Sequence, residues 1–311
     1  MESTVILVPT KGRPHHLERC LRSIEECAPN PRVVVIDQDP DAGAERLCQG
    51  FAGLALDYLH HPAGGKSAAL NAGIRASGST FIAFTDDDCT VPGDWIRAGT
   101  RSFAGAPRLA IVSGGAVACP HDPRREFVPA HIPGSREVRR GGRAVARIGA
   151  LGGNMFARRD ALERLGGFDE ALGPGCHFPS GEDQDLNNRA LRAGYDVLCD
   201  PSILVTHWGG RAYGDEATRL LRGYSRGIGA LAAKDVRLGS VTGVYPLIRE
   251  LSVELRLRRR GCRASRRGPI CVPEPVAHPG SLAGHESAPG PAGRLVRPGT
   301  SDLTAPPPIR C

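Results

Sequence analysis

The chain has 311 residues, of which 41% are hydrophobic and 23% charged, a composition that suits a globular protein with a sizeable core. The net charge of +7 resides at the end of the chain, because Leu255–Cys311 holds ten arginines and only three acidic residues. The preceding part is neutral and aromatic residues are scarce in the basic part, which excludes nucleic acid as a partner.

Two absences bear on location. The sequence has no run of about 18 apolar residues that could span a bilayer, and Met1–Pro9 lacks the basic and apolar regions of a secretory signal. The ten cysteines are scattered from Cys20 to Cys311 without a C-x-x-C pair, which favours free thiols in a reducing compartment. We therefore expect a cytoplasmic protein.

The first part of the chain alternates between strand and helix patterns. β-branched apolar runs predict strands, and apolar residues spaced three and four apart predict helices. The expected strands are Thr4–Val8, Arg32–Ile36, Thr80–Thr85 and Leu109–Ser113, and the expected helices are Leu17–Glu26, Ser67–Ala76 and Pro92–Phe103. A β-α-β order of this kind indicates an α/β fold with a Rossmann-like, mostly parallel central sheet flanked by helices.

The second part begins with Ala118–Arg147, whose Pro, Gly, Arg and His content predicts a long loop. The patterns after it predict strands at Asn154–Ala157 and Asp196–Val205 and helices at Arg159–Leu165, Glu182–Ala193, Arg219–Lys234 and Leu247–Arg260. Ten prolines follow from Pro269 onward, a composition that cannot build a core. We expect a domain over 1–235 made of two halves, about 1–115 and about 116–235, then a helical extension over 236–262 and a disordered, basic, proline-rich tail over 263–311.

Three aspartates, Asp86, Asp87 and Asp88, directly follow the apolar strand that ends at Thr85. Ligands of open α/β sheets bind at the carboxyl ends of parallel strands. If the backbone stays extended, Asp86 and Asp88 face one side and Asp87 the other. Clustered carboxylates suit a hard cation such as Mg²⁺ or Mn²⁺. The alternative is a solvated acidic turn.

Asp37 ends the second predicted strand, where a carboxylate can accept hydrogen bonds from a nucleotide base or ribose. The same residue can instead form an ordinary turn with the segment up to Asp41.

A second acidic group occurs in the segment from Ser180 to Leu186. Ser180 and Asp183 have the spacing of a helix capping box. Glu182, Asp183 and Asp185 together exceed what a cap requires, and a carboxylate at a helix start facing a cleft can deprotonate a hydroxyl. Both interpretations stay open. His207, at the end of the last predicted strand, is either a structural histidine or a third ligand of the metal held by the aspartates.

The ordered set of motifs resembles the family 2 glycosyltransferases over roughly residues 3 to 210. The motifs are Val5–Arg13, Asp37, Gly65–Gly73, Thr85–Cys89, Gly153–Phe156, Gly167–Glu170, Gly181–Asp185 and His207. Each is weak alone, and their order is what makes the resemblance specific. It implies a GT-A fold and transfer of a sugar, with inversion, from a nucleoside-diphosphate sugar to a hydroxyl of a glycan, a lipid-linked saccharide or a small molecule.

The resemblance also implies roles for individual residues. Asp183 is the general base, assisted by Glu182. The nucleotide-sugar residues are Pro9, Thr10, Arg13, Asp37, Lys66, Asn71, Asp86 and Asp87. A divalent metal, Mn²⁺ or Mg²⁺, is bound by Asp86, Asp88 and His207, and the acceptor by Asn154, Asp185 and Trp208. Leu70 stands where members often carry an arginine, and Gln-Asp-Pro follows Asp37 in place of Asn-Gly-Ser, so the donor is left undefined.

Other functions compete with this interpretation. A sugar nucleotidylyltransferase requires a glycine-rich loop after the first strand, and Val8–Arg13 has too little glycine. A non-catalytic, glycosyltransferase-like protein that binds a nucleotide sugar or a partner is disfavoured by the acids at 86, 88 and 183. The seven arginines of Arg256–Arg267 predict peripheral contact with an anionic membrane, at its inner face, or else mark a solvated helix end.

Overall fold

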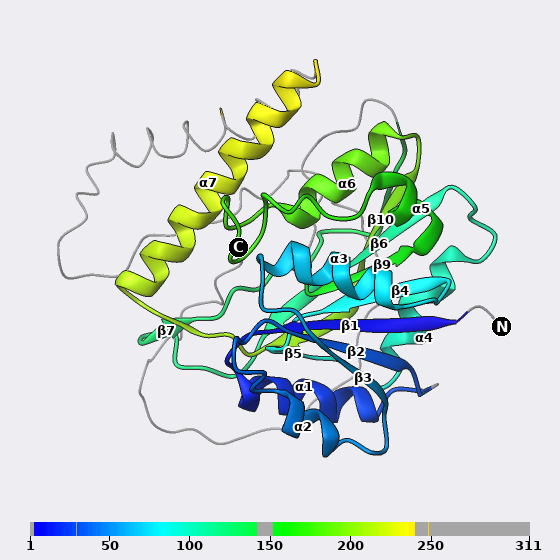
Figure 1. Cartoon of the computed structure of the whole chain (residues 1–311). Coiled ribbons are helices and arrows are strands. Elements are labelled where there is room, and N and C mark those ends of the chain that lie inside the picture. Colours follow the sequence, from blue (N-terminus) through cyan, green and yellow to red (C-terminus); the bar gives the residue numbers. More distant parts are fainter. Residues whose placement is uncertain (1–2, 29, 142–151, 240–247, 249–311) are drawn as a thin grey trace, which may run out of the picture.

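The computed structural model describes residues 3–28, 30–141, 152–239 and 248, and a twisted sheet forms their centre (Figure 1). Among these residues the sheet has nine strands, which are β1 Thr4–Thr10, β2 Arg32–Asp37, β3 Ala55–His60, β4 Phe81–Thr85, β5 Cys89–Thr90, β6 Leu109–Ala118, β8 Glu137–Arg139, β9 Asn154–Arg158 and β10 Asp196–His207. A separate two-stranded sheet pairs β7 Glu126–Phe127 with β11 Arg211–Ala212.

The strand order is β3-β2-β1-β4-β9-β6-β10-β5, with β8 also pairing with β10. β1 to β4 are parallel neighbours, and β6 pairs parallel with β10. β9 lies antiparallel between β4 and β6, so the strands on its two sides run in the same direction. The predicted mostly parallel sheet is confirmed, with β9, β5 and β8 running against it.

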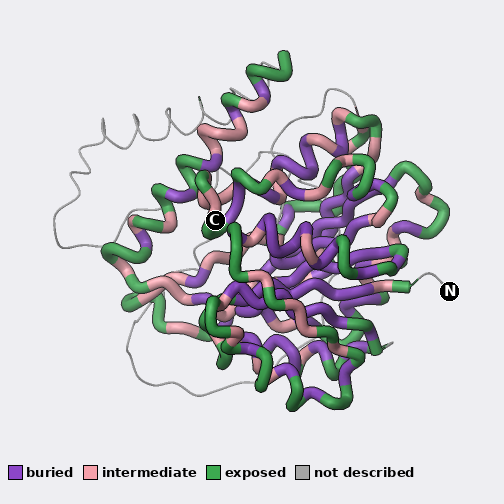
Figure 2. The backbone as a smooth tube through the Cα atoms, in the orientation of Figure 1, coloured by how far each residue is buried: buried purple, intermediate pink, exposed green. Residues whose placement is uncertain are grey.

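Helices cover both faces of the sheet (Figure 1). They are α1 Pro14–Glu25, α2 Glu45–Gln49, α3 Lys66–Ala76, α4 Trp95–Thr100 with a 3₁₀ turn Arg101–Phe103, α5 Arg159–Leu165, α6 Glu182–Arg192 and α7 Asp215–Arg237. Alternate residues of β1 divide the core: Ile6 and Val8 pack with the apolar face of α1, whereas Val5 and Leu7 pack with α3, α5 and α6. Figure 2 shows the buried backbone concentrated in these layers.

Most predicted helices and strands are present within a few residues of their expected ends. α2, β3 and β5 were not predicted, and Ala118–Arg139 contains two short strands where only a loop was expected. The boundary expected at residue 235 falls inside α7. The predicted helix Leu247–Arg260 and the tail lie, apart from Ile248, outside the described residues.

Two features bear on the expected location. The cysteines of the described part are all free thiols. No helix in this part is both long and apolar enough to cross a bilayer.

Candidate functional site

The carboxyl ends of β1, β2 and β4 meet at one edge of the sheet, where Thr10 lies beside Asp37. β4 ends at Thr85, and residues 86–89 form a turn closed by a 3.0 Å hydrogen bond from the Cys89 N–H to the Asp86 carbonyl. The expected alternation of the three aspartates is therefore wrong, because the backbone is not extended there. Asp87 and Asp88 both turn toward Arg13, and Asp86 turns toward Lys66.

Arg13, just before α1, holds two of these carboxylates. Its Nη1 donates to Asp88 Oδ2 at 2.7 Å and its Nε to Asp87 Oδ2 at 3.1 Å, and its Nη2 pairs with Asp87 Oδ1. The Thr10 hydroxyl donates to Asp87 Oδ2 at 2.7 Å. Burial raises the pKa of Asp87 to about 6 although Arg13 and Thr10 oppose the shift. Asp87 thus fixes the position of Arg13 at the sheet edge.

Lys66, the first residue of α3, joins the two acidic groups of the sequence. Its Nζ lies 2.5 Å from Asp86 Oδ1 and 3.6 Å from Glu182 Oε1. Asp183 is held next to them, because its Oδ2 accepts from the Gly152 N–H at 2.9 Å and its Oδ1 from the Gln184 N–H at 2.7 Å. Carboxylates that are about 100 residues apart in sequence therefore share one site.

The charged side chains around Lys66 shift one another's pKa values. Burial raises the pKa of Glu182 to about 7, and the neighbouring Asp183 adds to the shift. Burial also raises the pKa of Asp183 against the hydrogen bonds it accepts and the charge of Lys66. Burial alone would lower the pKa of Lys66, but Asp86 and Glu182 outweigh it and raise the pKa. A carboxylate with a raised pKa is a stronger base than a solvated one.

The capping-box interpretation of Ser180 and Asp183 is wrong. α6 begins after Gly181, and its first turn receives no side-chain cap. Ser180 instead donates its hydroxyl to the Gly223 carbonyl of α7 at 3.1 Å. Asp183 therefore does not form a capping box with Ser180, and the only N–H of the helix start that it is shown to accept is that of Gln184.

His207, the last residue of β10, faces Asp88. Its Nε2 lies 3.3 Å from Asp88 Oδ1, and its register partner in β5 is Cys89. Asp88, Cys89 and His207 each place one ligand atom within 4.8 Å of the others. Burial alone would raise the pKa of Asp88, but His207 and Arg13 outweigh it and lower the pKa. The O, N and S donors of this group fit a divalent cation. The predicted ligand Asp86 lies with Lys66 instead.

A cleft opens beside the Lys66 cluster, with a volume of about 150 Å³. It is lined by Pro9, Thr10, Lys11, Arg13, Gln38, Gly64, Gly65, Lys66, Pro174 and Gly175. The structure thus brings together four of the predicted nucleotide-sugar residues, Pro9, Thr10, Arg13 and Lys66, along one cavity. Trp208 lies at the other end of the site, where its indole N–H donates to Thr90 Oγ1 at 3.0 Å and the guanidinium of Arg19 lies 4.2 Å from its ring centroid.

Four predicted site residues are tied into the protein interior. Asp37 is fully buried, and its carboxylate accepts hydrogen bonds from the backbone N–H groups of Asp39 and Ala44 and from the Tyr58 hydroxyl, each at 2.9 Å. This is the turn that was the alternative to nucleotide contact. The expected contact of Asp37 with a nucleotide stays a prediction.

The amides of Asn71 and Asn154 are used in the same way. Asn71 donates to the Phe168 carbonyl and to Glu170, and accepts from the Phe168 N–H. Asn154 is fully buried, donates to two strand carbonyls and accepts from the Trp95 indole. The amide of Asn154 is thus fully engaged inside the protein, and its expected contact with an acceptor stays a prediction.

Asp185 is 1% exposed. Its Oδ2 accepts from Arg189 Nε at 2.7 Å, and its Oδ1 lies 2.6 Å from Lys234 Nζ of α7. The carboxylate therefore links α7 to α6, and the expected acceptor contact of Asp185 stays a prediction.

Sequence reasoning missed two contributors to the site, Cys89 and Gly152, and it assigned the segment around Pro174 to acceptor choice without predicting that it contacts α3. The Pro174 carbonyl accepts the Lys66 N–H at 2.9 Å, which places this loop over the start of α3. A proline and glycines carried no chemical signal in the sequence, and the register of β5 against β10 could not be predicted from two residues.

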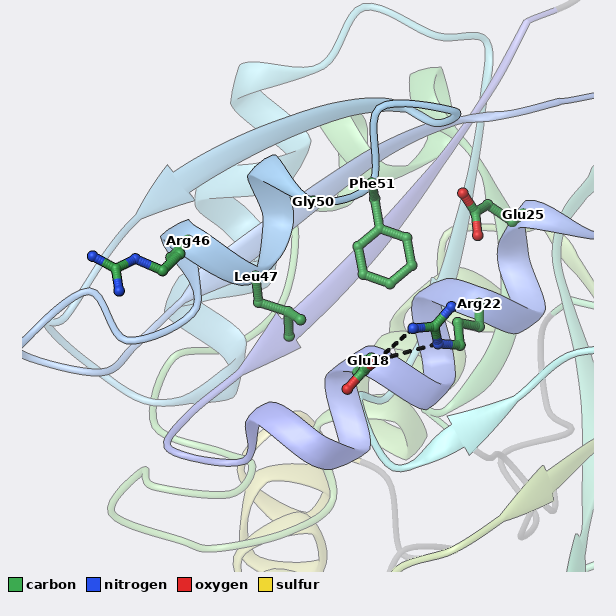
Figure 3. A pocket seen from close by; sticks show the side chains of 7 residues that line it. All are labelled: Glu18, Arg22, Glu25, Arg46, Leu47, Gly50 and Phe51. Carbon is green, nitrogen blue, oxygen red and sulfur yellow. Dashed lines mark hydrogen bonds and ion pairs between the residues drawn. The ribbon is translucent and has the colours of Figure 1, made fainter.

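A larger cavity of about 310 Å³ lies between α1 and α2 (Figure 3). It is lined by Glu18, Arg22, Glu25, Arg46, Leu47, Gly50 and Phe51. Arg22 forms an ion pair with Glu18, one turn away on α1. None of the residues described above lines it. The predicted site residues therefore lie outside this cavity.

Comparison with known proteins agrees with this geometry. The model of the family described as glycosyl transferase family 2 matches residues 5–166. Curated relatives are glycosyltransferase AglE of Haloferax volcanii, 24% identical over 217 residues, and the pre-mycofactocin glycosyltransferase of Mycobacterium tuberculosis, 28% identical over 208 residues. Each match covers 65% of this chain, but 66% of the first relative and 42% of the second.

Solved structures show the same fold. The S. aureus TarS fragment 1–349 in complex with UDP-GlcNAc has a TM-score of 0.55 at 16% identity, covering 70% of this chain and 60% of that one. The mannosyltransferase PcManGT from Pyrobaculum calidifontis in complex with GDP-Man and Mn²⁺ has a TM-score of 0.53 at 22% identity, covering 76% and 64%. The fold is GT-A, as expected. The chain belongs to glycosyl transferase family 2.

Proposed function

We propose that this chain transfers a sugar from a nucleoside-diphosphate donor to an acceptor hydroxyl, with inversion at the anomeric carbon and Asp183 as the general base. The observation that carries the proposal is the position of Lys66, whose ammonium joins Asp86 at the sheet edge to Glu182 beside Asp183. The elements assigned here to the donor and to the base thus meet at Lys66, which also lines the cleft. The nucleotide sugars bound by TarS and PcManGT support this class of donor.

The residues divide the reaction between them. Arg13 and Lys66, on the wall of the cleft, supply positive charge for a diphosphate. Asp183, held by two backbone N–H groups, takes the proton of the acceptor hydroxyl as its oxygen attacks the anomeric carbon opposite the leaving diphosphate. A divalent cation at Asp88 and His207 would stabilise the charge on that leaving group. Acceptors of this class include a glycan, a lipid-linked saccharide or a small molecule.

The donor is identified by screening UDP-, GDP- and dTDP-sugars for release of the nucleoside diphosphate with Mn²⁺, with Mg²⁺ and with a chelator. We expect release from one group of donors and its loss on chelation. Donor binding without release under any condition, with every acceptor class offered, would support the non-catalytic alternative instead.

The base is tested by Asp183→Asn. We expect transfer to fall by about 10²–10⁴-fold, the usual contribution of a general base, while the affinity for the donor stays within about threefold. The matched control is Asp160→Asn, an exposed aspartate in the first turn of α5. Near wild-type transfer by Asp183→Asn would place the base elsewhere.

A further inference from the structure

The proposed function gives a role to Asp88 and His207 but none to Cys89, the third member of the group formed by Asp88, Cys89 and His207. It is the first residue of β5, is 2% exposed, and lies directly opposite His207 in the antiparallel β5–β10 pair. Side chains opposite each other in such a pair share a face, with their Cβ atoms roughly 5 Å apart. The strand register therefore places the Cys89 thiol and the His207 imidazole next to each other on the same face of the sheet.

Only a few ligand atoms of this group are available to bind an ion, because neighbouring side chains occupy the others. Asp88 Oδ2 is occupied by Arg13, so Oδ1, which faces His207 Nε2, is the oxygen available to an ion. The other ring nitrogen of His207, Nδ1, is buried and has no hydrogen-bond partner among the described residues. Asp86 pairs with Lys66 through Oδ1 and is not among the three residues whose ligand atoms all lie within 4.8 Å of one another. One oxygen, one nitrogen and one sulfur remain.

We propose that Cys89 is a metal ligand, and that Asp88, Cys89 and His207 form a site that prefers borderline and soft divalent ions, Zn²⁺ and Co²⁺ above all, over Mg²⁺. The sulfur binds as a thiolate, and its proton passes to solvent when the ion enters. Thiolate and imidazole ligands select Zn²⁺ and related ions, whereas Mg²⁺ requires oxygen ligands. The inference shares its metal site with the proposed function but does not require turnover.

The test is a titration of the full-length, metal-free chain with Co²⁺, followed by near-ultraviolet absorption. A thiolate bound to Co²⁺ gives a charge-transfer band that carboxylate and imidazole ligands do not give. We expect the band in the wild type, its loss in Cys89→Ser and in His207→Ala, and its displacement by Zn²⁺ but not by a large excess of Mg²⁺. The affinity for Zn²⁺ should fall in Cys89→Ser by at least the roughly 10–100-fold that loss of even an outer-shell partner costs.

Cys199→Ser is the matched control, since Cys199 is a buried thiol of β10 outside the group, and it should keep the band. Cys89→Ala serves if a buried hydroxyl prevents folding, with thermal unfolding as the check. Absence of the band in the wild type, or its persistence without Cys89 or His207, overturns the inference and leaves metal-dependent transfer intact. A site-specific band in a protein that transfers no sugar overturns the proposed function and leaves the metal site.

Discussion

Glu182 shows how burial sets the chemistry of a single side chain. It lies beside Asp183 and near Lys66, and its pKa is raised from 4.5 to about 7. A carboxyl group with a higher pKa in the folded state binds its proton more tightly there than in the unfolded chain. The free energy of unfolding therefore contains a contribution that falls as the pH rises from about 4.5 to about 7.

Glu182→Gln should remove this contribution. We expect the variant to lose part of the fall in stability between pH 5 and pH 8, and to be more stable than the wild type at pH 8 by about 1–3 kcal/mol. Urea unfolding of the metal-free proteins at several pH values measures it. Glu163→Gln, at an exposed position of α5, is the control. Parallel stability profiles for Glu182→Gln and the wild type would show that Glu182 does not titrate in this range.

At the residue scale the sequence predicted which side chains carry charge at the site, but not which of them face the cleft. Asp86 and Asp183 were correctly assigned to the ends of elements that meet. Asp37, Asn154 and Asp185 looked equally functional, yet each is satisfied inside the protein by partners that only the fold brings near. The expected alternation of the aspartates failed because residues 86–89 form a turn closed by one hydrogen bond, so the backbone after Thr85 is not extended.

At the scale of elements, Asn71 joins α3 to the segment that follows α5. Its Oδ1 accepts from the Phe168 N–H at 2.8 Å, and a Cβ added to Gly167 would collide with the same oxygen. Gly167 has φ +72° and the preceding Gly166, which ends α5, has φ +76°. A Cβ on Gly166 would meet nothing within 4 Å. The two neighbours thus share their backbone conformation and differ in their surroundings.

This difference predicts unequal effects of the same substitution. Gly166→Ala should lower the free energy of unfolding by about 1 kcal/mol, the cost of positive φ for a residue with a Cβ. Gly167→Ala should lower it by about 2–4 kcal/mol, since the Asn71 contacts are lost as well. Denaturant unfolding of both variants, and of Asn71→Ala with and without Gly167→Ala, measures the coupling. Equal losses in the free energy of unfolding for the two variants would mean that the Asn71 side chain moves aside without loss of stability.

The elements that the sequence did not reveal are short or lie at an edge. α2 has five residues, and β3 is an edge strand whose side chains are only partly buried, so neither carries a strong apolar period. β1, β2 and β4 are buried on both faces and were predicted from their continuous apolar runs. Long, strongly patterned elements were therefore predictable, and two-residue strands such as β5 were not.

At the scale of the whole molecule, the basic surplus lies in Leu255–Cys311, outside the described residues. The cluster Arg256–Arg267 predicts binding to anionic membranes, each arginine near the surface contributing about 1 kcal/mol. We expect the full chain to sediment with vesicles containing phosphatidylserine at low salt and less at moderate salt, and a chain ending at Glu254 to stay in solution. Neutral vesicles are the control. Binding that does not depend on anionic lipid, or that survives the deletion, contradicts the prediction.

The position of the antiparallel strand β9 has a consequence for both acidic groups of the site. β9 begins where the parallel strands end, so the two residues just before it lie at the site. Gly152 donates its N–H to Asp183, and Gly153 lies next to Asp86. A Cβ added to Gly153 would approach Asp86 Oδ2 to 2.9 Å, so a side chain at this position would displace that carboxylate. The same substitution should therefore disturb the site unequally at these two neighbours, because a Cβ added at Gly152 would come no closer than 3.4 Å to Lys66, Glu182 or Asp183.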